Sequence, residues 1–154
     1  MEGETVMGEI LAVCISEKKG EQKHPVPQAE LRENWGIVGD AHAGPWHRQV
    51  SLLGQESVEK LRAQLPDVTL GPGDFAENLL VRGLTLYTLP VGTRLKLGAQ
   101  VMAEVTQIGK TCHKGCAIRR LTGDCVMPRE GIFVRILTPG TLRPGDPIAV
   151  IPEE

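Results

Sequence analysis

Hydrophobic residues along this chain fall into short runs and alternating stretches, a pattern typical of β-strands. The first run, GEILAVCIS at residues 8–16, is short, partly β-branched and followed by a polar stretch. We therefore expect a buried strand there. Further strands are predicted by LLVRGL, by TRLKLG, in which Leu95 and Leu97 alternate with Arg94 and Lys96, and by AQVMAEVTQIG. These three segments are expected to form sequential antiparallel strands.

The end of the chain repeats this pattern. GIFVRIL and DPIAVI each predict a strand, and the Pro and Gly residues of the intervening TPGTLRPG suit a loop between paired strands. The best helix candidate is Gln55 to Leu65, because Val58, Leu61 and Leu65 share one face and Pro66 ends the pattern. With no linker or domain boundary, residues 1–154 predict a single mainly β, barrel-like domain with one or two short helices.

Composition agrees with this prediction. A chain of 154 residues with 41% hydrophobic residues can bury one core, and the 18 Gly and 11 Pro residues favour many turns. The net charge of −2 provides no positive field for nucleic acid or an anionic membrane. The N-terminal MEGETVMGEILAVCIS lacks the basic start of a signal peptide. We expect a cytoplasmic protein that binds neither nucleic acid nor membrane.

Three of the four cysteines lie close together, at Cys112, Cys116 and Cys125. In a reducing compartment such clustering favours thiol chemistry or metal binding over disulfides. Cys14 stands apart in an apolar run, where a thiol behaves as a small buried hydrophobe, and we assign it no function.

The segment IGKTCHKGCAIRRLTGDC surrounds two of these thiols with positive charge. Its basic residues are Lys110, Lys114, Arg119 and Arg120, and no acidic residue lies between Glu104 and Asp124. Nearby cations stabilise the thiolate form of cysteine. The segment therefore predicts a reactive cysteine next to an anion-binding group.

Two other interpretations of this segment stay open. His113 and the three cysteines could hold a structural zinc ion, although the Cys-x3-Cys-x8-Cys spacing lacks the paired short knuckles of common zinc sites. Alternatively, the cysteines are packed thiols beside solvated basic residues.

A second candidate segment, GIVGDAHAGPWHRQVSLL, brings Asp40, His42, His47 and Arg48 into nine residues. The planar guanidinium of Arg48 suits a phosphate or carboxylate. Each histidine alone could equally be a hydrogen-bonded structural residue, but the four side chains together indicate a site.

Two other polar segments carry weaker predictions. In GPGDFAENLLVRG, Asn78 is a possible polar contact beside residues that usually organise turns. The basic stretch with Lys18, Lys19, Lys23 and His24 is expected to be a solvated loop, with an anion contact as the alternative. No phosphate-binding glycine motif or serine nucleophile elbow is present.

The segments GDAHAGPWHRQVSLL, GDFAENL, QIGKTCHKGCAI and GDCVMPREGIFVRIL, in this order, resemble the MOSC domain family, named after the C-terminal part of molybdenum cofactor sulfurases. The resemblance runs from about Gly8 to Pro152, and the chain is similar to the short bacterial members of the family that consist of this domain alone. It implies a mostly β barrel with a site at one end and a cysteine that carries sulfur or ligates molybdenum. CHKGCAI has one residue more than the C-x-x-C-I stretch of the amidoxime-reducing relatives, so both Cys112 and Cys116 are candidates.

This resemblance implies the molybdenum cofactor, a pyranopterin, held permanently or only in transit. The expected partners are a cofactor-biosynthesis or sulfurtransferase protein, such as a pyridoxal phosphate desulfurase, and a molybdoenzyme acceptor. Asp40, His42 and His47 would line the pocket, with Asn78 and His113 as further polar contacts. The basic residues that would neutralise the pterin phosphate are Arg48, Lys110, Lys114, Arg119 and Arg120. A small molybdenum-dependent oxidoreductase and a non-catalytic zinc module are the alternatives.

Overall fold

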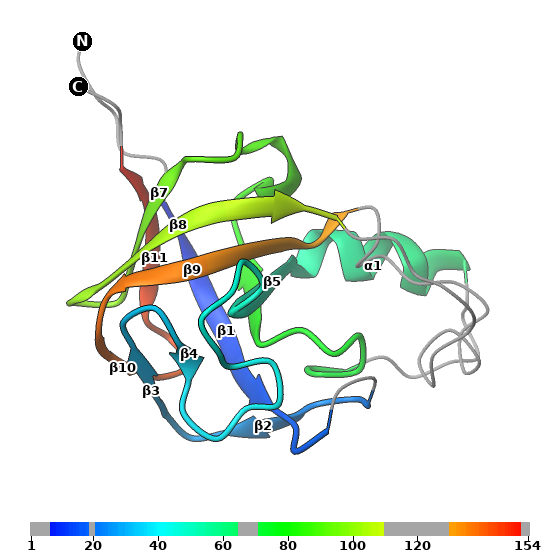
Figure 1. Ribbon diagram of the computed structural model, residues 1–154. Coiled ribbons are helices and arrows are strands. Elements are labelled where there is room, and N and C mark those ends of the chain that lie inside the picture. The colour runs from blue at the N-terminus through cyan, green and yellow to red at the C-terminus, as the bar shows by residue number, and fades with distance from the viewer. Residues whose placement is uncertain (1–6, 19–20, 65–70, 110–129, 152–154) are drawn as a thin grey trace, which may run out of the picture.

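A computed structural model describes residues 7–18, 21–64, 71–109 and 130–151 of the chain. Within them the protein is mainly β, with one α-helix and one short 3₁₀-helix, η1 (Figure 1). The elements in chain order are β1 Met7–Ile15, β2 His24–Val26, β3 Ala29–Arg32, β4 Gly36–Ile37, β5 Val50–Gly54, α1 Gln55–Gln64, β6 Leu79–Arg82, η1 Leu86–Thr88, β7 Arg94–Leu97, β8 Val101–Ile108, β9 Ile132–Thr138, β10 Gly140–Leu142 and β11 Pro147–Ile151.

Seven strands form a closed barrel. They are hydrogen-bonded in the order β11, β7, β8, β9, β5, β6 and β1, and a pairing between β1 and β11 closes the ring. The long strand β1 makes this closure possible, because its first part pairs with β11 and its last part with the short β2. All neighbours are antiparallel except β5 and β6, which are parallel and connected through α1. The predicted barrel is confirmed.

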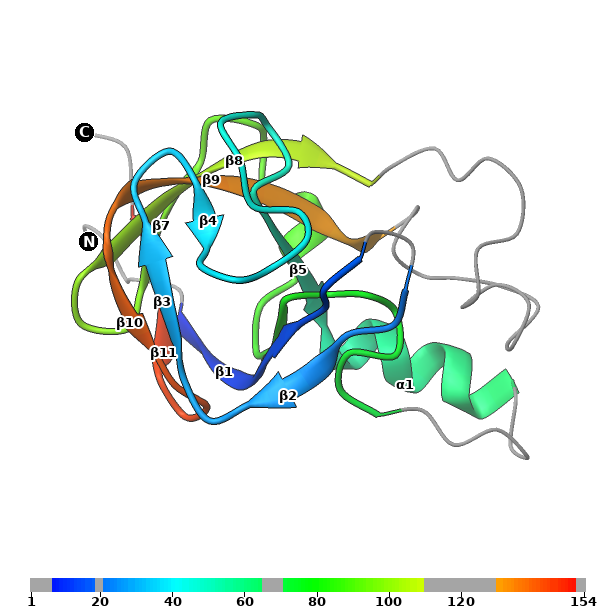
Figure 2. The same ribbon diagram turned by 60° about the horizontal axis from the view of Figure 1, so that its bottom comes forward.

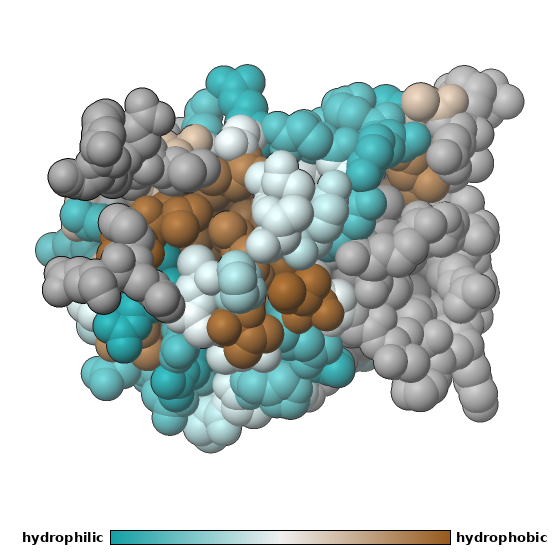
Figure 3. Space-filling model, turned by 90° about the horizontal axis from the view of Figure 1, so that it is seen from above, coloured by the Kyte–Doolittle hydropathy of each residue, from teal (hydrophilic) through white to brown (hydrophobic). Residues whose placement is uncertain are grey.

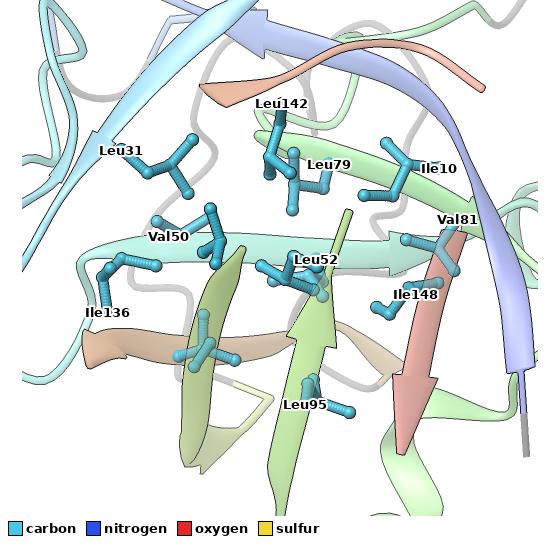
Figure 4. Close-up of a cluster of buried hydrophobic side chains, with 14 of the residues drawn as sticks. Ile10, Leu31, Val50, Leu52, Leu79, Val81, Leu95, Ile136, Leu142 and Ile148 are labelled. Carbon is cyan, nitrogen blue, oxygen red and sulfur yellow. The ribbon is translucent and has the colours of Figure 1, made fainter. Parts of the chain in front are cut away.

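Alternating side chains of the barrel strands build two hydrophobic clusters. In β6, Leu79 and Val81 point into the barrel, whereas Leu80 between them joins a second cluster. The interior cluster, drawn in Figure 4, contains side chains from most of the strands. The second cluster includes Val58 and Leu61 of α1, so this helix covers part of the outside of the barrel. The predicted helix is thus confirmed, with Val58 and Leu61 on its buried face, whereas Leu65 lies outside the described residues.

A small second sheet of β10, β3 and β4 lies against the barrel (Figure 2). It changes one prediction, because the segment TPGTLRPG contains β10 rather than a loop between paired strands. β9 pairs with β8 and β5, whereas β11 pairs with β7 and β1. The segments GIFVRIL and DPIAVI, which form β9 and β11, are therefore not paired with each other. Of the three segments expected as sequential strands, β7 and β8 are antiparallel neighbours, but β6 is separated from them in the sheet.

Most of the large hydrophobic side chains are covered. Figure 3 shows hydrophobic residues gathered on the face seen from above Figure 1. Among the described residues, Val91 and Met7 are the most exposed of the large hydrophobic side chains, at 62% and 56%.

None of the helices in the described ranges is long and apolar enough to cross a membrane.

The loop before β6 packs tightly against the chain before β2. The backbone N–H of Lys23 donates to the carbonyl of Gly73 at 2.8 Å. Gly73 has a φ of +85°, and a Cβ atom at this position would lie 2.1 Å from the carbonyl oxygen of Lys23. Only glycine permits this approach, which fixes the backbone of Lys23.

Replacing Gly73 with alanine should therefore destabilise the protein more than a positive φ alone does. Gly92 is a matched control, because its φ is +98° and an added Cβ would meet nothing within 4 Å. We expect Gly92→Ala to cost about 1–2 kcal/mol, the ordinary penalty for an L-residue in this conformation. Gly73→Ala should cost clearly more, as measured by urea unfolding; equal costs would contradict the tight contact.

Candidate functional site

A buried ion pair lies at the centre of the candidate site. The Lys23 ammonium is 2.8 Å from Oδ1 of Asp40, and both side chains are fully inaccessible to solvent. Oδ1 also accepts a hydrogen bond from the backbone N–H of Ser16, the residue after β1. The pair thus joins the end of β1, the chain before β2 and the loop that contains Asp40. Two charges buried in this way are stable only when they are paired and hydrogen-bonded.

His42 completes this cluster. Its backbone N–H donates to Oδ2 of Asp40 at 3.0 Å, and its Nδ1 lies 3.1 Å from the Lys23 ammonium. Its carbonyl accepts a hydrogen bond from the indole of Trp46 at 2.7 Å. The His42 side chain is 20% exposed, whereas Asp40 and Lys23 are covered. His42 is therefore the member of the cluster that a ligand can reach.

The segment GDFAENL, residues 73–79, packs against the backbone of Lys23 and so supports the cluster of Lys23, Asp40 and His42. Glu77 is fully buried and accepts hydrogen bonds from the backbone N–H groups of Gly73 and Phe75. Burial raises the pKa of Glu77 to about 7, although the two N–H donors partly offset this effect. Because Gly73 packs against Lys23, Glu77 holds the turn on which the lysine backbone rests.

Asn78 is also fully buried, and its side chain joins neighbouring strands. Its amide donates to the carbonyl of Cys14 at 3.0 Å, and its Oδ1 accepts from the backbone N–H of Ser51 at 3.0 Å. These contacts give Asn78 a role in the barrel wall. Its predicted contact with a cofactor stays a prediction.

Arg48 lies at the end of the same loop as Asp40 and is half-buried. Its Nε donates to Oε1 of Gln107 at 3.1 Å, and its guanidinium lies 5.4 Å from the centre of the Phe133 ring. No carboxylate of the described residues pairs with it, and its terminal amino groups have no hydrogen-bond partner there. The guanidinium is thus held in place while two donor groups and a full positive charge stay available for an anion.

His47 points to a different hollow. Its ring meets that of Trp46 edge to face, with centroids 5.6 Å apart. Both residues line a groove of about 480 Å³ over β8 and β9, together with Thr106, Glu104 and Arg135. Glu104 and Arg135, which are neighbours on β8 and β9, form an ion pair in the lining of this groove. The structure therefore brings Asp40 and His42 together, while His47 lies on the wall of this separate groove.

The cysteine-bearing segment is joined to the barrel beside Arg48. The amide of Gln107 donates to the carbonyl of Gly109, and the backbone N–H of Gly109 donates to the carbonyl of Gly131 at 2.6 Å. Residues 110–129 are thus connected to the barrel at two adjacent points. This range lies outside the described residues, and it contains Lys110, Cys112, His113, Lys114, Cys116, Arg119, Arg120 and Cys125.

A second hollow of about 420 Å³ lies beside the start of α1. Ser57 and Lys60 both contact Glu130 there, and Lys60 lies 5.4 Å from the centre of the Tyr87 ring. The hydrogen bond to Glu130 raises the pKa of Lys60, so this lysine stays protonated and cannot act as a base toward Ser57. Glu130 instead anchors the return of the cysteine-bearing segment to the helix.

Lys23 is the main residue that the sequence analysis missed. The stretch Lys18 to His24 was expected to be a solvated loop, and this is wrong for Lys23, which is only 4% exposed. The reason is its pairing with Asp40, 17 residues away, which no local pattern reveals. Cys14 is fully buried as predicted, and burial raises the pKa of its thiol to about 12. No group of three or more metal-ligating side chains exists within the described ranges.

Comparisons with known proteins give a consistent result. A model of the MOSC domain family matches residues 39–149. Among solved structures, the chain is similar to the YuaD protein from Bacillus subtilis, with a TM-score of 0.81, 18% identity and coverage of 98% of this chain and 99% of that one. YiiM from Geobacillus stearothermophilus gives a TM-score of 0.73 at 19% identity, covering 95% and 75%. YiiM from Escherichia coli gives 0.66 at 17% identity, covering 97% and 70%. No curated protein sequence matches the chain.

Because the ion pair of Lys23 and Asp40 is buried, removing the charge of one partner should lower the free energy of unfolding strongly. We expect Asp40→Asn to lower the free energy of unfolding by about 3–5 kcal/mol, because the Lys23 charge would stay buried without its counter-charge. Glu9→Gln is the matched control, since Glu9 pairs with Arg82 at the surface, where the side chains are 38% and 61% exposed. That change should cost about 0–1 kcal/mol. Chemical denaturation of both variants measures the difference, and similar costs would contradict our description of the pair.

The raised pKa of Glu77 predicts that the free energy of unfolding decreases as the pH rises. Its pKa is raised in the folded protein, from an ordinary 4.5 to about 7, so the unfolded chain ionises this group more readily. The stabilisation is therefore complete below about pH 4.5 and is lost as the pH rises through about 7. Glu77→Gln should remove this component, which urea unfolding at a series of pH values would measure. A variant with the same pH dependence as the native protein would show that Glu77 does not cause it.

Proposed function

Because this chain belongs to the MOSC domain family, we propose that it binds the molybdenum cofactor, or carries sulfur for it, through Cys112 or Cys116. The proposal rests on one observation above all: within the described part of the chain, the guanidinium of Arg48 is held without an acidic partner, next to the start of the cysteine-bearing segment. A half-buried, unpaired positive charge costs free energy unless an anion compensates it. The pterin phosphate is the anion that we assign to it.

The chemistry of the described residues fits this cofactor. Arg48 offers a fork of terminal N–H groups suited to a phosphate, and the contacts with Gln107 and Phe133 keep that fork in one orientation. His42 offers an accessible imidazole in a cluster whose charges are otherwise neutralised, since Lys23 and Asp40 cancel each other. The site thus carries net positive charge from Arg48, which favours an anionic ligand.

The cofactor, when bound, supplies the molybdenum and its redox chemistry. The chain would supply a soft thiolate from Cys112 or Cys116, the ligand type that suits the metal or a transferable sulfur. Lys110, Lys114, Arg119 and Arg120 surround these cysteines in sequence and favour the thiolate over the thiol. Asp40 would act indirectly, by keeping the His42 loop in place.

A sulfur-carrying role needs no outside oxidant. When a cysteine thiolate attacks the terminal sulfur of a donor persulfide, one S–S bond forms, the S–S bond of the donor breaks, and the donor leaves as a thiolate. We propose a desulfurase or other sulfurtransferase as donor and a molybdoenzyme as acceptor, in the cytoplasm, where free thiols stay reduced. A carrier releases its cargo on transfer, whereas an oxidoreductase would retain the cofactor through turnover.

The cysteine assignment is tested by replacing both candidate thiols. Protein produced with the cofactor pathway active and purified without a metal-affinity tag is analysed by native mass spectrometry and elemental analysis. We expect a pterin mass with molybdenum, or a sulfur adduct, in the native protein and its loss in Cys112→Ser/Cys116→Ser. The single variants show which thiol is needed, and Cys14→Ala is the control. Unchanged retention in the double variant would refute the proposal, and stoichiometric zinc alone would support a structural zinc site instead.

The role of Arg48 is tested separately. Arg48→Gln should reduce cofactor retention by at least tenfold, because charge-assisted hydrogen bonds to phosphate contribute about 1.5–3 kcal/mol. Arg82→Gln removes the same charge from a surface ion pair and should leave retention unchanged. Equal retention by both variants would show that Arg48 does not contact the ligand.

A further inference from the structure

We infer that Gln107 is a positioning residue that makes the Arg48 guanidinium bind an oxyanion end-on, through its two terminal amino groups. Because Arg48 is the residue assigned to the pterin phosphate, this role deepens the proposed function and rests on it. Gln107 fixes the guanidinium with a neutral amide, which supplies no counter-charge. A carboxylate at the same place would neutralise Arg48 from within the protein and so take the place of the ligand.

A β-bulge in β8 places Gln107 beside Arg48. Val105 and Gln107 pair with consecutive residues of β9, so Thr106 between them is an additional residue on β8. In a regular strand Gln107 would share the face of Val105, which points into the barrel. The bulge instead places Gln107 opposite Phe133, whose side chain belongs to the second hydrophobic cluster. Cross-strand partners share a face of the sheet, so Gln107 and Phe133 hold Arg48 together.

The same bulge holds the backbone next to Arg48. The hydroxyl of Thr106 is in hydrogen-bonding contact with the carbonyls of His47 and Phe133. It thus connects the residue before Arg48 to both strands at the bulge. The backbone and the guanidinium of Arg48 are therefore positioned from one irregularity in β8.

The contacts of the Gln107 amide determine its orientation. Nε of Arg48 is a donor, so it requires the amide oxygen, which lies 3.1 Å away. The carbonyl of Gly109 is an acceptor, so it requires the amide nitrogen, which lies 2.6 Å away. Turning the amide over would place donor against donor and acceptor against acceptor. Gln107 therefore ties the guanidinium to the residue at which the cysteine-bearing segment leaves the barrel.

The contact with Gln107 selects how Arg48 binds an anion. A guanidinium carries five N–H groups, one on Nε and four on the two terminal nitrogens. Gln107 uses the Nε–H, so a side-on pair of Nε and one terminal nitrogen is not available to a ligand. The two terminal nitrogens have no hydrogen-bond partner among the described residues. They form a fork that matches two oxygens of a phosphate group, either free or in a monoester.

Substitutions of Gln107 separate the effect of charge from that of hydrogen bonding. Glutamate keeps the size and the acceptor of Gln107 but adds a negative charge next to Arg48, whereas methionine is neutral and loses both hydrogen bonds. If the availability of the Arg48 charge decides binding, Gln107→Glu should weaken anion binding more than Gln107→Met does. A purely structural role predicts the opposite order, because methionine removes more contacts.

Phosphate binding by the cofactor-free protein measures this difference. Protein labelled with ¹⁵N-arginine is titrated with inorganic phosphate at low ionic strength, and the Arg48 Nε–H resonance, assigned with Arg48→Gln, is followed by NMR. We expect a saturable shift in the native protein. Gln107→Glu should raise the phosphate dissociation constant by about tenfold or more, because its carboxylate neutralises the guanidinium. Gln107→Met should raise it by a few-fold at most, since only the preorganisation of the fork is lost.

Gln28→Glu is the matched control for an added charge. Oε1 of Gln28 accepts a hydrogen bond from Nε of Arg143 at 3.1 Å, which is the same contact as that of Gln107 with Arg48, but on the exposed surface. This variant adds the same charge to the chain and places it beside a different arginine. The response of Arg48 to phosphate should therefore equal that of the native protein.

The inference is overturned if the native Arg48 resonance does not respond to phosphate, or if Gln107→Glu binds phosphate no more weakly than Gln107→Met. If Gln107→Glu does not fold, Gln107→Met still decides, because a loss of binding as complete as in Arg48→Gln would contradict the inference. Glycerol phosphate, a monoester like the pterin phosphate, should bind as well. Binding of inorganic phosphate alone would support the role of Gln107 and contradict the assignment of the pterin phosphate to Arg48.

Discussion

A lysine ammonium that is withdrawn from water needs a counter-charge and three acceptors inside the protein, and the loops at the candidate site are arranged around this requirement for Lys23. Asp40 supplies the counter-charge, the Ser16 hydroxyl and Nδ1 of His42 lie within hydrogen-bonding distance of the ammonium, and Gly73 fits against the lysine backbone. These residues come from four separate parts of the chain. Each part has to reach its position before the charge is fully compensated, so the pair couples folding of the barrel wall to the geometry of the site.

Lys23 and Arg48, the two cationic side chains discussed for the site, differ in their surroundings. Lys23 is paired and covered, and its charge is neutralised by Asp40. Arg48 is held by an amide and an aromatic ring, neither of which neutralises it. Among the described residues, the positive charge of Arg48 is therefore presented without a counter-charge next to Gln107, near the start of the cysteine-bearing segment. This division explains how a protein with a net charge of −2 can offer a local site for an anion.

Local sequence patterns predicted most of the fold, because strands and helices follow from periodic hydrophobic positions. The strand at residues 8–16, the helix from Gln55 and the alternation of Leu95 and Leu97 all reflect such patterns. Strand partners were less predictable, since β9 and β11 are close in sequence but pair with other strands. At the site, the grouping of Asp40 and His42 was expected, and they lie in one cluster. Lys23 and Gln107 were missed because their partners are 17 and 59 residues away.

The hydrogen bond between Gly109 and Gly131 closes the cysteine-bearing segment at its base. The free energy needed to close a loop rises only slowly with its length, and here the barrel strands keep the two ends together in any case. We therefore expect insertions and deletions between these two glycines to leave the register of β8 and β9 unaffected. We expect such changes to alter the spacing of Cys112 and Cys116 without altering the barrel strands. The barrel strands and the length of the chain between Gly109 and Gly131 are thus two independent properties of the protein.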